Sequence, residues 1–159
     1  MELNLPGPQK FFIMPHAIFY VDDDSDDLTF FKEACDSLGT QVKLFALGDD
    51  LIQAMENPPP EPKIIFLDLN MPVKSGFDIL EEIRKCAAYH EIPLIVLSTA
   101  GDISNVNKCH ALGANYYFIK PTSMKIMIEM LSHALTIDWL NYDRSIETFV
   151  YSGVRAQAI

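Results

Sequence analysis

Four short apolar runs in this chain are each followed directly by side chains that could bind a cation or a phosphoryl group. Open α/β sheets carry their functional groups beyond the carboxyl ends of the strands. Three carboxylates, a hydroxyl and an ammonium gathered there would form a cation-dependent site for a phosphoryl group. The residues are Asp22 and Asp23, Asp68, Ser98 and Lys120, after the runs 17–21, 64–67, 94–97 and 116–119.

The carboxylates among these residues are ligands expected for Mg²⁺. This ion takes oxygen ligands in octahedral geometry, keeps several waters and uses only one or two carboxylates directly. We expect Asp23 and Asp68 to bind the ion directly and Asp22 to act through a water molecule. The backbone carbonyl of Asn70, in the turn after Asp68, would complete the protein's share. Mn²⁺, which also accepts oxygen ligands, is the alternative ion.

Asp68 is the expected nucleophile, because a carboxylate can form an acyl phosphate and this residue follows the central strand. Phosphoryl transfer depends mostly on positioning and on charge neutralisation. Lys120 would pair with one phosphoryl oxygen, and Ser98 would donate its hydroxyl to another. A lone serine or lysine after a strand is usually a solvated loop residue, but the matching positions of these residues favour a site.

The composition excludes several classes of protein. The chain has 159 residues, 49% of them hydrophobic, and a net charge of −10 from 22 acidic and 12 basic residues. This charge argues against direct nucleic-acid binding, which needs clustered Lys and Arg. No apolar run approaches the roughly 20 residues that span a bilayer, and the N-terminus lacks a signal-peptide pattern. Three separated cysteines without metal-site spacing indicate reduced thiols and a cytoplasmic location.

Strand and helix patterns alternate along the chain, which predicts an α/β fold with a parallel sheet covered on both faces. Ser25 is the expected N-cap of the first helix. In the fourth helix, over 102–112, we expect Ile103, Val106 and Cys109 to face inward. Five strands are expected, each followed by a helix: 17–21, 42–45, 64–67, 94–97 and 116–119.

The expected organisation is one domain with an extension at each end. Residues 1–15 form an N-terminal extension, 16–136 the domain, and 137–159 a tail too short to build an effector domain with its own core. Ile137, Trp139 and Leu140 would prolong the last helix and pack on the domain. The run 149–151 has three interpretations, as a short strand, a partner contact or a frayed end.

Together these motifs resemble the receiver domains of bacterial two-component response regulators, including the single-domain chemotaxis regulator. Residues 21–24, Val-Asp-Asp-Asp, look like the acidic end of the family's first strand. Residues 67–72, Leu-Asp-Leu-Asn-Met-Pro, followed by Gly76, look like its phosphorylation-site signature. Ser98 holds the place of its switch hydroxyl, and Lys120 with Pro121 that of its lysine turn. The resemblance covers about residues 16–136.

This resemblance implies a flavodoxin-like, doubly wound (βα)5 sandwich with a five-stranded parallel sheet of order 2-1-3-4-5. It implies that Asp68 accepts a phosphoryl group from a sensor histidine kinase or a phosphotransfer protein. Ser98 would then move toward the phosphoryl group and Tyr117 would swing inward, which biases a two-state equilibrium. The face of the fourth helix, fifth strand and fifth helix would bind or release a downstream protein. The chain is expected to be a monomer or a weak homodimer.

Two other functions stay open. A Mg²⁺-dependent phosphatase would use Asp68 as its nucleophile, but such enzymes commonly place a second acid two residues later, where this chain has Asn70. A scaffold receiver would never take up phosphate, and the intact acids with Ser98 and Lys120 speak against it. We therefore expect self-phosphorylation and self-dephosphorylation, not enzymatic turnover. Tyr117 could instead be an edge-strand aromatic residue, half packed on the surface.

Overall fold

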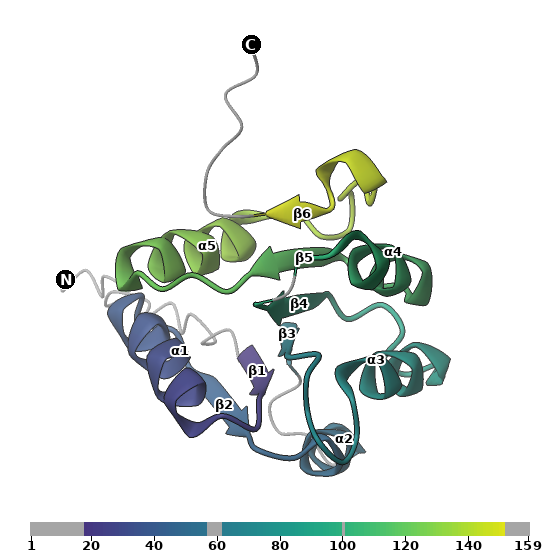
Figure 1. Ribbon diagram of the computed structural model, residues 1–159, viewed down its shortest axis with the longest axis horizontal. Helices are drawn as coiled ribbons and strands as arrows, with labels where there is room; N and C mark the ends of the chain where they lie inside the picture. Colours follow the sequence, from purple (N-terminus) through teal and green to yellow (C-terminus); the bar gives the residue numbers. More distant parts are fainter. Residues whose placement is uncertain (1–17, 57–61, 100, 152–159) are drawn as a thin grey trace, which may run out of the picture.

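Six parallel strands form one sheet in the part of the chain that the structure describes (Figure 1). The structure is a computed structural model, and it describes residues 18–56, 62–99 and 101–151. The flavodoxin-like fold and the predicted order of the first five strands are confirmed, and a sixth strand is added at the edge. The order is β2-β1-β3-β4-β5-β6, with β1 Ile18–Val21, β2 Val42–Phe45, β3 Ile64–Leu67, β4 Leu94–Ser98, β5 Tyr116–Ile119 and β6 Val150–Tyr151.

Helices cover both faces of the sheet. Side chains alternate between the faces along each strand, so Ile18 and Tyr20 lie in the core on one face, and Phe19 and Val21 in the core on the other. Strands buried on both faces read as continuous apolar runs, which is why the runs were visible in the sequence. α1 (Ser25–Ser37) and α5 (Met124–Thr136) lie on one face, and α2 (Gly48–Glu56), α3 (Gly76–Lys85) and α4 (Ile103–Leu112) on the other (Figure 1).

The N-cap of α1 differs from the prediction by one residue. Asp24 has an extended backbone, and its side chain accepts hydrogen bonds from the backbone N–H groups of Asp26 and Asp27. Ser25 is already the first helical residue, so its prediction as N-cap is wrong. A carboxylate at this position satisfies amide groups that the first turn leaves unpaired. Asp24 therefore serves the helix, as expected for an acid at a helix N-terminus.

α4 buries a narrow face. Val106 and Cys109 are buried as predicted, but Ile103 is 76% exposed. Ile103 is the first residue of the helix, directly after the N-cap Asp102. It lies almost one turn before Val106, the first buried residue, and therefore at the helix end, beyond the part that packs on the domain. Its prediction as an inward residue is therefore wrong. No helix in the described ranges is long and apolar enough to cross a membrane.

Residues 137–151, the C-terminal strap, follow α5 and return to the edge of the sheet. α5 ends at Thr136, and Ile137 takes an extended backbone (φ −71°, ψ 132°), so the prediction that the last helix continues past residue 136 is wrong. Ile137 and Trp139 pack on the domain as predicted, but Leu140 is 95% exposed, so its predicted packing is wrong. A 3-10 turn, η1 (Ile146–Thr148), leads into β6, which pairs in parallel with β5. Of the three interpretations of residues 149–151, the short strand is the one observed. Residues 1–15 lie outside the described part of the chain.

Candidate functional site

The strand register brings the predicted site residues to one edge of the sheet. Val21 of β1 pairs with Leu67 of β3, and the backbone N–H of Asp68 donates to the carbonyl of Val21 at 3.1 Å. Asp22 and Asp68 each directly follow one residue of this pair, so they lie side by side at the ends of neighbouring strands. Ser98 ends β4, and its carbonyl accepts a hydrogen bond of 2.9 Å from the backbone N–H of Lys120.

Three carboxylates meet at this edge. Asp22, Asp23 and Asp68 each offer an oxygen, and these oxygens lie within 4.8 Å of one another. Asp22 and Asp68 are buried, whereas Asp23 is exposed, so the cluster has one side open to solvent. This donor set suits a hard divalent cation, which prefers carboxylate oxygens and retained waters. The three predicted metal-binding carboxylates are thus brought together.

Asp68 is a buried acid beside other acids. Its side chain is 6% exposed. Burial, and then the charge of Asp22, raise the pKa of Asp68, and Lys120 opposes that rise. Desolvation and like charges both disfavour the ionised form of a carboxyl group. A cation bound at this cluster would favour the ionised form.

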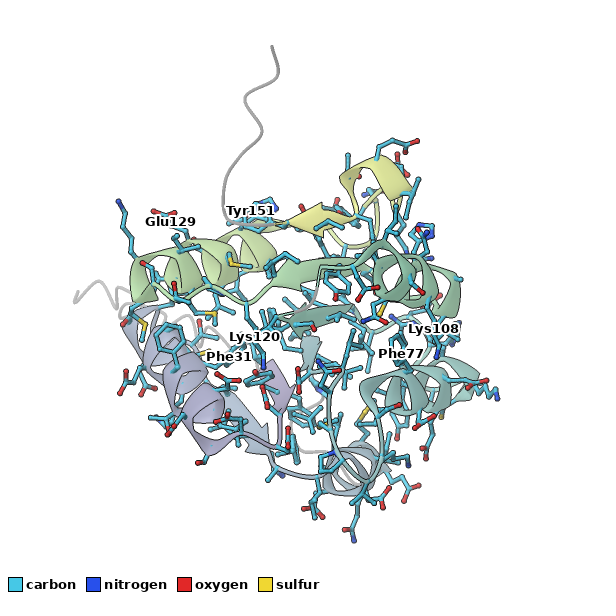
Figure 2. The ribbon with its side chains drawn as sticks, in the orientation of Figure 1. Phe31, Phe77, Lys108, Lys120, Glu129 and Tyr151 are labelled. Carbon is cyan, nitrogen blue, oxygen red and sulfur yellow. The ribbon has the colours of Figure 1, made fainter. Side chains whose placement is uncertain are left out.

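Lys120 is the cation that the protein itself supplies. Its Nζ lies 2.7 Å from Asp22 Oδ2, 2.8 Å from Asp27 Oδ2 and 3.3 Å from Asp68 Oδ1. Its side chain is only 11% exposed and lies between the end of β5 and α1 (Figure 2). Burial lowers the pKa of Lys120, but the hydrogen bonds to Asp22 and Asp27 outweigh burial and leave that pKa raised. Lys120 is therefore charged at neutral pH.

Two residues of the site, Tyr20 and Asp27, were not predicted from the sequence. The hydroxyl of Tyr20 donates to Asp22 Oδ2 at 2.5 Å, and burial followed by the charge of Asp22 raises the pKa of Tyr20. Tyr20 of β1 stands two residues before Asp22, which directly follows the strand, so their side chains point to the same side; this spacing is a usable signal. Asp27 reaches Lys120 from the first turn of α1. It is one of five acids within residues 22–27, and this run does not indicate which of them contacts Lys120.

Ser98 and Tyr117 lie next to each other inside the protein. Both are fully buried, and their side chains share a hydrogen bond. Burial raises the pKa of Tyr117. The alternative that Tyr117 is a half-packed residue of an edge strand is wrong, because β6 covers the outer edge of β5. Tyr117 is therefore already buried in this structure, and its inward movement on phosphorylation stays a prediction.

The turn after β3 is held by a close contact between two backbones. The N–H of Gly76 donates to the carbonyl of Leu69 at 3.0 Å. A Cβ atom at Gly76 would lie 2.2 Å from the carbonyl oxygen of Asp68 and 2.7 Å from Leu69 Cα, so only glycine fits. The turn thereby fixes the direction in which Asp68 leaves β3. Asn70 is exposed in the same turn, and its backbone carbonyl as a metal ligand stays a prediction.

Comparisons with known proteins point to one family. The model of the response regulator receiver domain matches residues 18–132. Response regulator Rcp1 of Synechocystis sp. is 29% identical over 124 residues, which cover 74% of this chain and 84% of that protein. Chemotaxis protein CheY1 of Helicobacter pylori is 28% identical over 120 residues, covering 74% of this chain and 95% of that protein. The crystal structure of the Mn²⁺-bound form of Rcp1 has a TM-score of 0.67 at 25% identity and covers 81% of this chain and 97% of that one.

Proposed function

This chain belongs to the response regulator receiver domain family, and from that premise we propose that it is a signalling switch phosphorylated on Asp68. The observation that carries the proposal is the position of this carboxylate. Asp68 lies within the cluster of acids, with the Nζ of Lys120 3.3 Å from its Oδ1. An oxygen nucleophile thus lies beside one positive charge, Lys120, and within a set of carboxylates that could hold a cation; positioning and charge neutralisation are the main requirements of phosphoryl transfer.

The phosphoryl donor is a phosphohistidine of a sensor histidine kinase or of a phosphotransfer protein. An oxygen of Asp68 attacks the phosphorus; the P–O bond forms, the P–N bond breaks, and its electron pair stays on the departing imidazole. Lys120 is placed to pair with a phosphoryl oxygen. Asp23 and Asp68 would hold Mg²⁺ or Mn²⁺, with Asp22 through a water molecule. The ion would supply positive charge that offsets the carboxylates and the phosphoryl oxygens.

The output is a change in the surface over α4, β5 and α5. Ser98 would donate its hydroxyl to the new phosphoryl oxygen, and Tyr117 would be held in its buried position beside Ser98. A downstream protein would read this face, which in this chain includes the C-terminal strap because β6 lies on β5. Three free cysteines suit a reducing compartment, so we place this exchange in the cytoplasm.

A phosphatase acting on small phosphate esters is less well supported. Such an enzyme would need an acid to protonate the leaving group, and the residue two positions after Asp68 is the exposed amide Asn70. A scaffold that never takes up phosphate would have no need of a buried lysine among the carboxylates. We therefore propose that the chain phosphorylates and dephosphorylates only itself.

Acetyl phosphate with Mg²⁺ tests the proposal directly. We expect intact-mass measurement to show one added phosphoryl group on the unaltered chain and none on Asp68→Asn. Asp50→Asn, which removes an exposed acid from α2, is the matched control and should be labelled normally. An unaltered chain that takes up no phosphoryl group would overturn the proposal. Steady release of phosphate from p-nitrophenyl phosphate would identify a phosphatase instead.

A further inference from the structure

The C-terminal strap contacts β5 at the residue expected to switch. The backbone N–H of Tyr117 donates to the carbonyl of Phe149 at 2.8 Å. Phe149 is fully buried, and its ring centroid lies 6.3 Å from that of Tyr117 and 4.9 Å from that of His110. Both aromatic residues belong to the same core cluster as Val106 and Cys109 of α4. Phe149 therefore fills the space between β5 and α4 beside the Tyr117 ring.

A second anchor of the strap lies at the C-terminal end of α4. The guanidinium of Arg144 donates to the carbonyls of Ala114 (2.9 Å) and His110 (3.0 Å). In return, a ring N–H of His110 donates to the carbonyl of Arg144 at 2.7 Å. Carbonyls at a helix C-terminus lack partners within the helix and carry partial negative charge, so a partly buried cation there is well placed. These contacts are specific and reciprocal.

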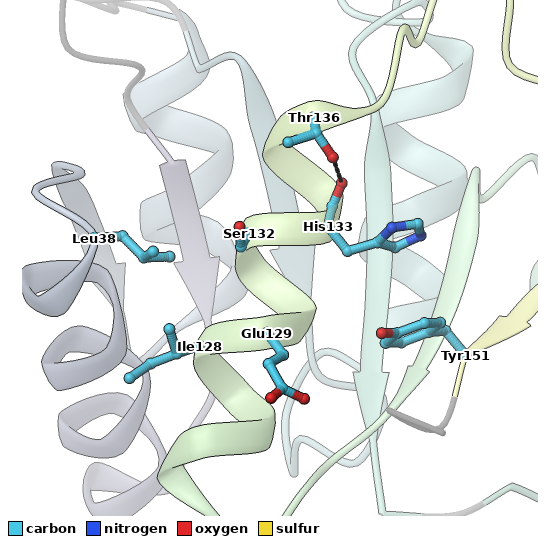
Figure 3. A pocket seen from close by; sticks show the side chains of 7 residues that line it. All are labelled: Leu38, Ile128, Glu129, Ser132, His133, Thr136 and Tyr151. Atoms are coloured by element: carbon cyan, nitrogen blue, oxygen red, sulfur yellow. Dashed lines mark hydrogen bonds between the residues drawn. The ribbon is translucent and has the colours of Figure 1, made fainter. Parts of the chain in front are cut away.

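A third anchor lies on the α5 side of the strap. The ring of Tyr151 stacks on that of His133 with centroids 4.9 Å apart and planes 14° apart, beside a shallow hollow between α1 and α5 (Figure 3). The Tyr151 ring also lies 5.2 Å from that of Phe118 on β5. The strap is thus fixed on both sides of β5, and Tyr117 lies beneath it.

Tyr117 connects the strap to the candidate site. Its side chain shares a hydrogen bond with Ser98, whose carbonyl accepts from the N–H of Lys120. A hydroxyl has one donor and two acceptor sites. Ser98 can therefore donate to a phosphoryl oxygen on Asp68 while it still accepts from Tyr117. The arrangement with the strap bound is compatible with a phosphorylated site.

We propose that the C-terminal strap and the phosphoryl group on Asp68 favour the same buried position of Tyr117, and that Phe149 is the positioning residue. This inference rests on the function proposed above. A Tyr117 ring that turned out to solvent would leave a cavity beside Phe149, which is costly in a packed core. It would also have to pass the strap that covers this edge. Strap binding and phosphorylation therefore strengthen each other by the same factor, as linkage requires.

Hydrogen exchange on the full chain tests this coupling. The amide of Tyr117, which donates to Phe149, reports strap binding directly, and the amides of 144–151 report it along the strap. We compare the chain with Mg²⁺ alone and with Mg²⁺ and beryllofluoride, which mimics the phosphoryl group. We expect beryllofluoride to slow exchange at these amides by about 5-fold or more, the usual lower size of an allosteric coupling.

Variants of the strap test the reverse direction. We expect Phe149→Ala to weaken the apparent affinity of the Mg²⁺-bound chain for beryllofluoride by about 5-fold, and Phe149→Leu to restore most of it. Val150→Ala is the matched control, because Val150 is the next residue of the strap and is 43% exposed; its affinity should not change. If Phe149→Ala fails to fold, Arg144→Gln weakens the strap at the other anchor, and hydrogen exchange on the unaltered chain still decides.

The outcomes separate this inference from the proposed function. Normal phosphorylation with unchanged or faster exchange at Tyr117 and in the strap would overturn the coupling and leave the proposed function standing. No response to either acetyl phosphate or beryllofluoride would overturn the proposed function, and the coupling with it. Slower exchange confined to the strap and its contacts on activation, together with a weaker beryllofluoride affinity in Phe149→Ala that Phe149→Leu restores, supports the coupling.

Discussion

At the carboxyl edge of the sheet, one lysine faces three carboxylates. Lys120 is nearest to Asp22 and Asp27, at 2.7 and 2.8 Å, and lies 3.3 Å from Asp68. Asp68 is also buried, and the charge of Asp22 acts on it. The carboxylate proposed as phosphoacceptor is therefore costly to ionise while the site lacks a cation. This cost has a consequence for stability that can be measured.

The first prediction concerns the pH dependence of that cost. The pKa of Asp68 is raised in the folded state by burial and by Asp22. The contribution of such an acid to the free energy of unfolding is fully present below its pKa in the unfolded chain. This contribution is lost as the pH rises through its pKa in the folded protein. With EDTA at pH 7, Asp68→Asn should therefore raise the free energy of unfolding by about 1–2 kcal/mol. The gain should vanish as pH falls below about 4.

Urea unfolding of both chains from pH 3.5 to pH 7 measures this difference. Taking the difference between the two chains removes the contribution of the other acids, as long as they titrate alike in both. Asp50→Asn, at an exposed acid, should show no such trend. If Asp68→Asn instead destabilised the protein in EDTA at pH 7, the attraction of Lys120 for the ionised Asp68 would outweigh the cost of burying that charge.

At the scale of elements, the turn after β3 and the start of α1 direct the site residues. The close approach at Gly76 sets the turn that Asp68 begins. The cap at Asp24 fixes where α1 begins, and Asp27 in its first turn reaches Lys120. Each of these local devices can be removed by one substitution.

Gly76→Ala should destabilise the protein by about 1–3 kcal/mol, the usual cost of overpacking. The new Cβ would lie 2.2 Å from a backbone oxygen, which cannot move aside as a flexible side chain can. Gly39→Asn is the matched control: Gly39 has φ +64° with nothing within 4 Å of an added Cβ, and asparagine tolerates this conformation. Thermal unfolding of the two variants should show a clear loss only for Gly76→Ala.

Asp24→Ala should lower the free energy of unfolding by about 1 kcal/mol, the typical value of an N-cap side chain. The adjacent Ser25→Ala, at the first helical residue, should stay within about 0.5 kcal/mol of the unaltered chain. Denaturant midpoints measured in parallel distinguish the two. A larger loss of unfolding free energy in Ser25→Ala than in Asp24→Ala would show that Ser25 is the N-cap, as the sequence predicts.

At the scale of the whole molecule, the carboxylate cluster exists only when β1 and β3 are paired. The unfolded chain has no such cluster, so a cation that binds it stabilises the native state by mass action. We expect Mg²⁺ at about 100 times its Kd to add about 2.7 kcal/mol to the free energy of unfolding.

Asp23→Asn should remove most of this gain, because it removes an exposed member of the cluster and leaves the core unchanged. Urea unfolding with Mg²⁺ and with EDTA measures the gain for each chain. Asp50→Asn should keep it. An equal Mg²⁺ effect in Asp23→Asn would place the ion elsewhere.

Most of the fold and the central residues of the site could be predicted from the pattern of the sequence. Asp22, Asp68, Ser98 and Lys120 could be predicted because each follows an apolar run, and parallel strands buried on both faces bring such positions to one edge. Errors of one residue, as at Ser25, arose because neighbouring Asp and Ser are both good caps. Ile103 was misplaced because helical spacing does not tell where a helix meets the sheet.

The sequence by itself determined the order of elements, the acids, the hydroxyl and the lysine, because these depend on local periodicity and on the residue at each strand end. Only the tertiary structure decided that Asp27 joins Lys120 and that Tyr20 binds Asp22. Only the tertiary structure decided, too, that β6 covers β5 and that Tyr117 lies buried beneath the strap. These contacts depend on which strand lies at the edge and on how a helix and a returning chain pack. No periodicity within one segment records such long-range choices.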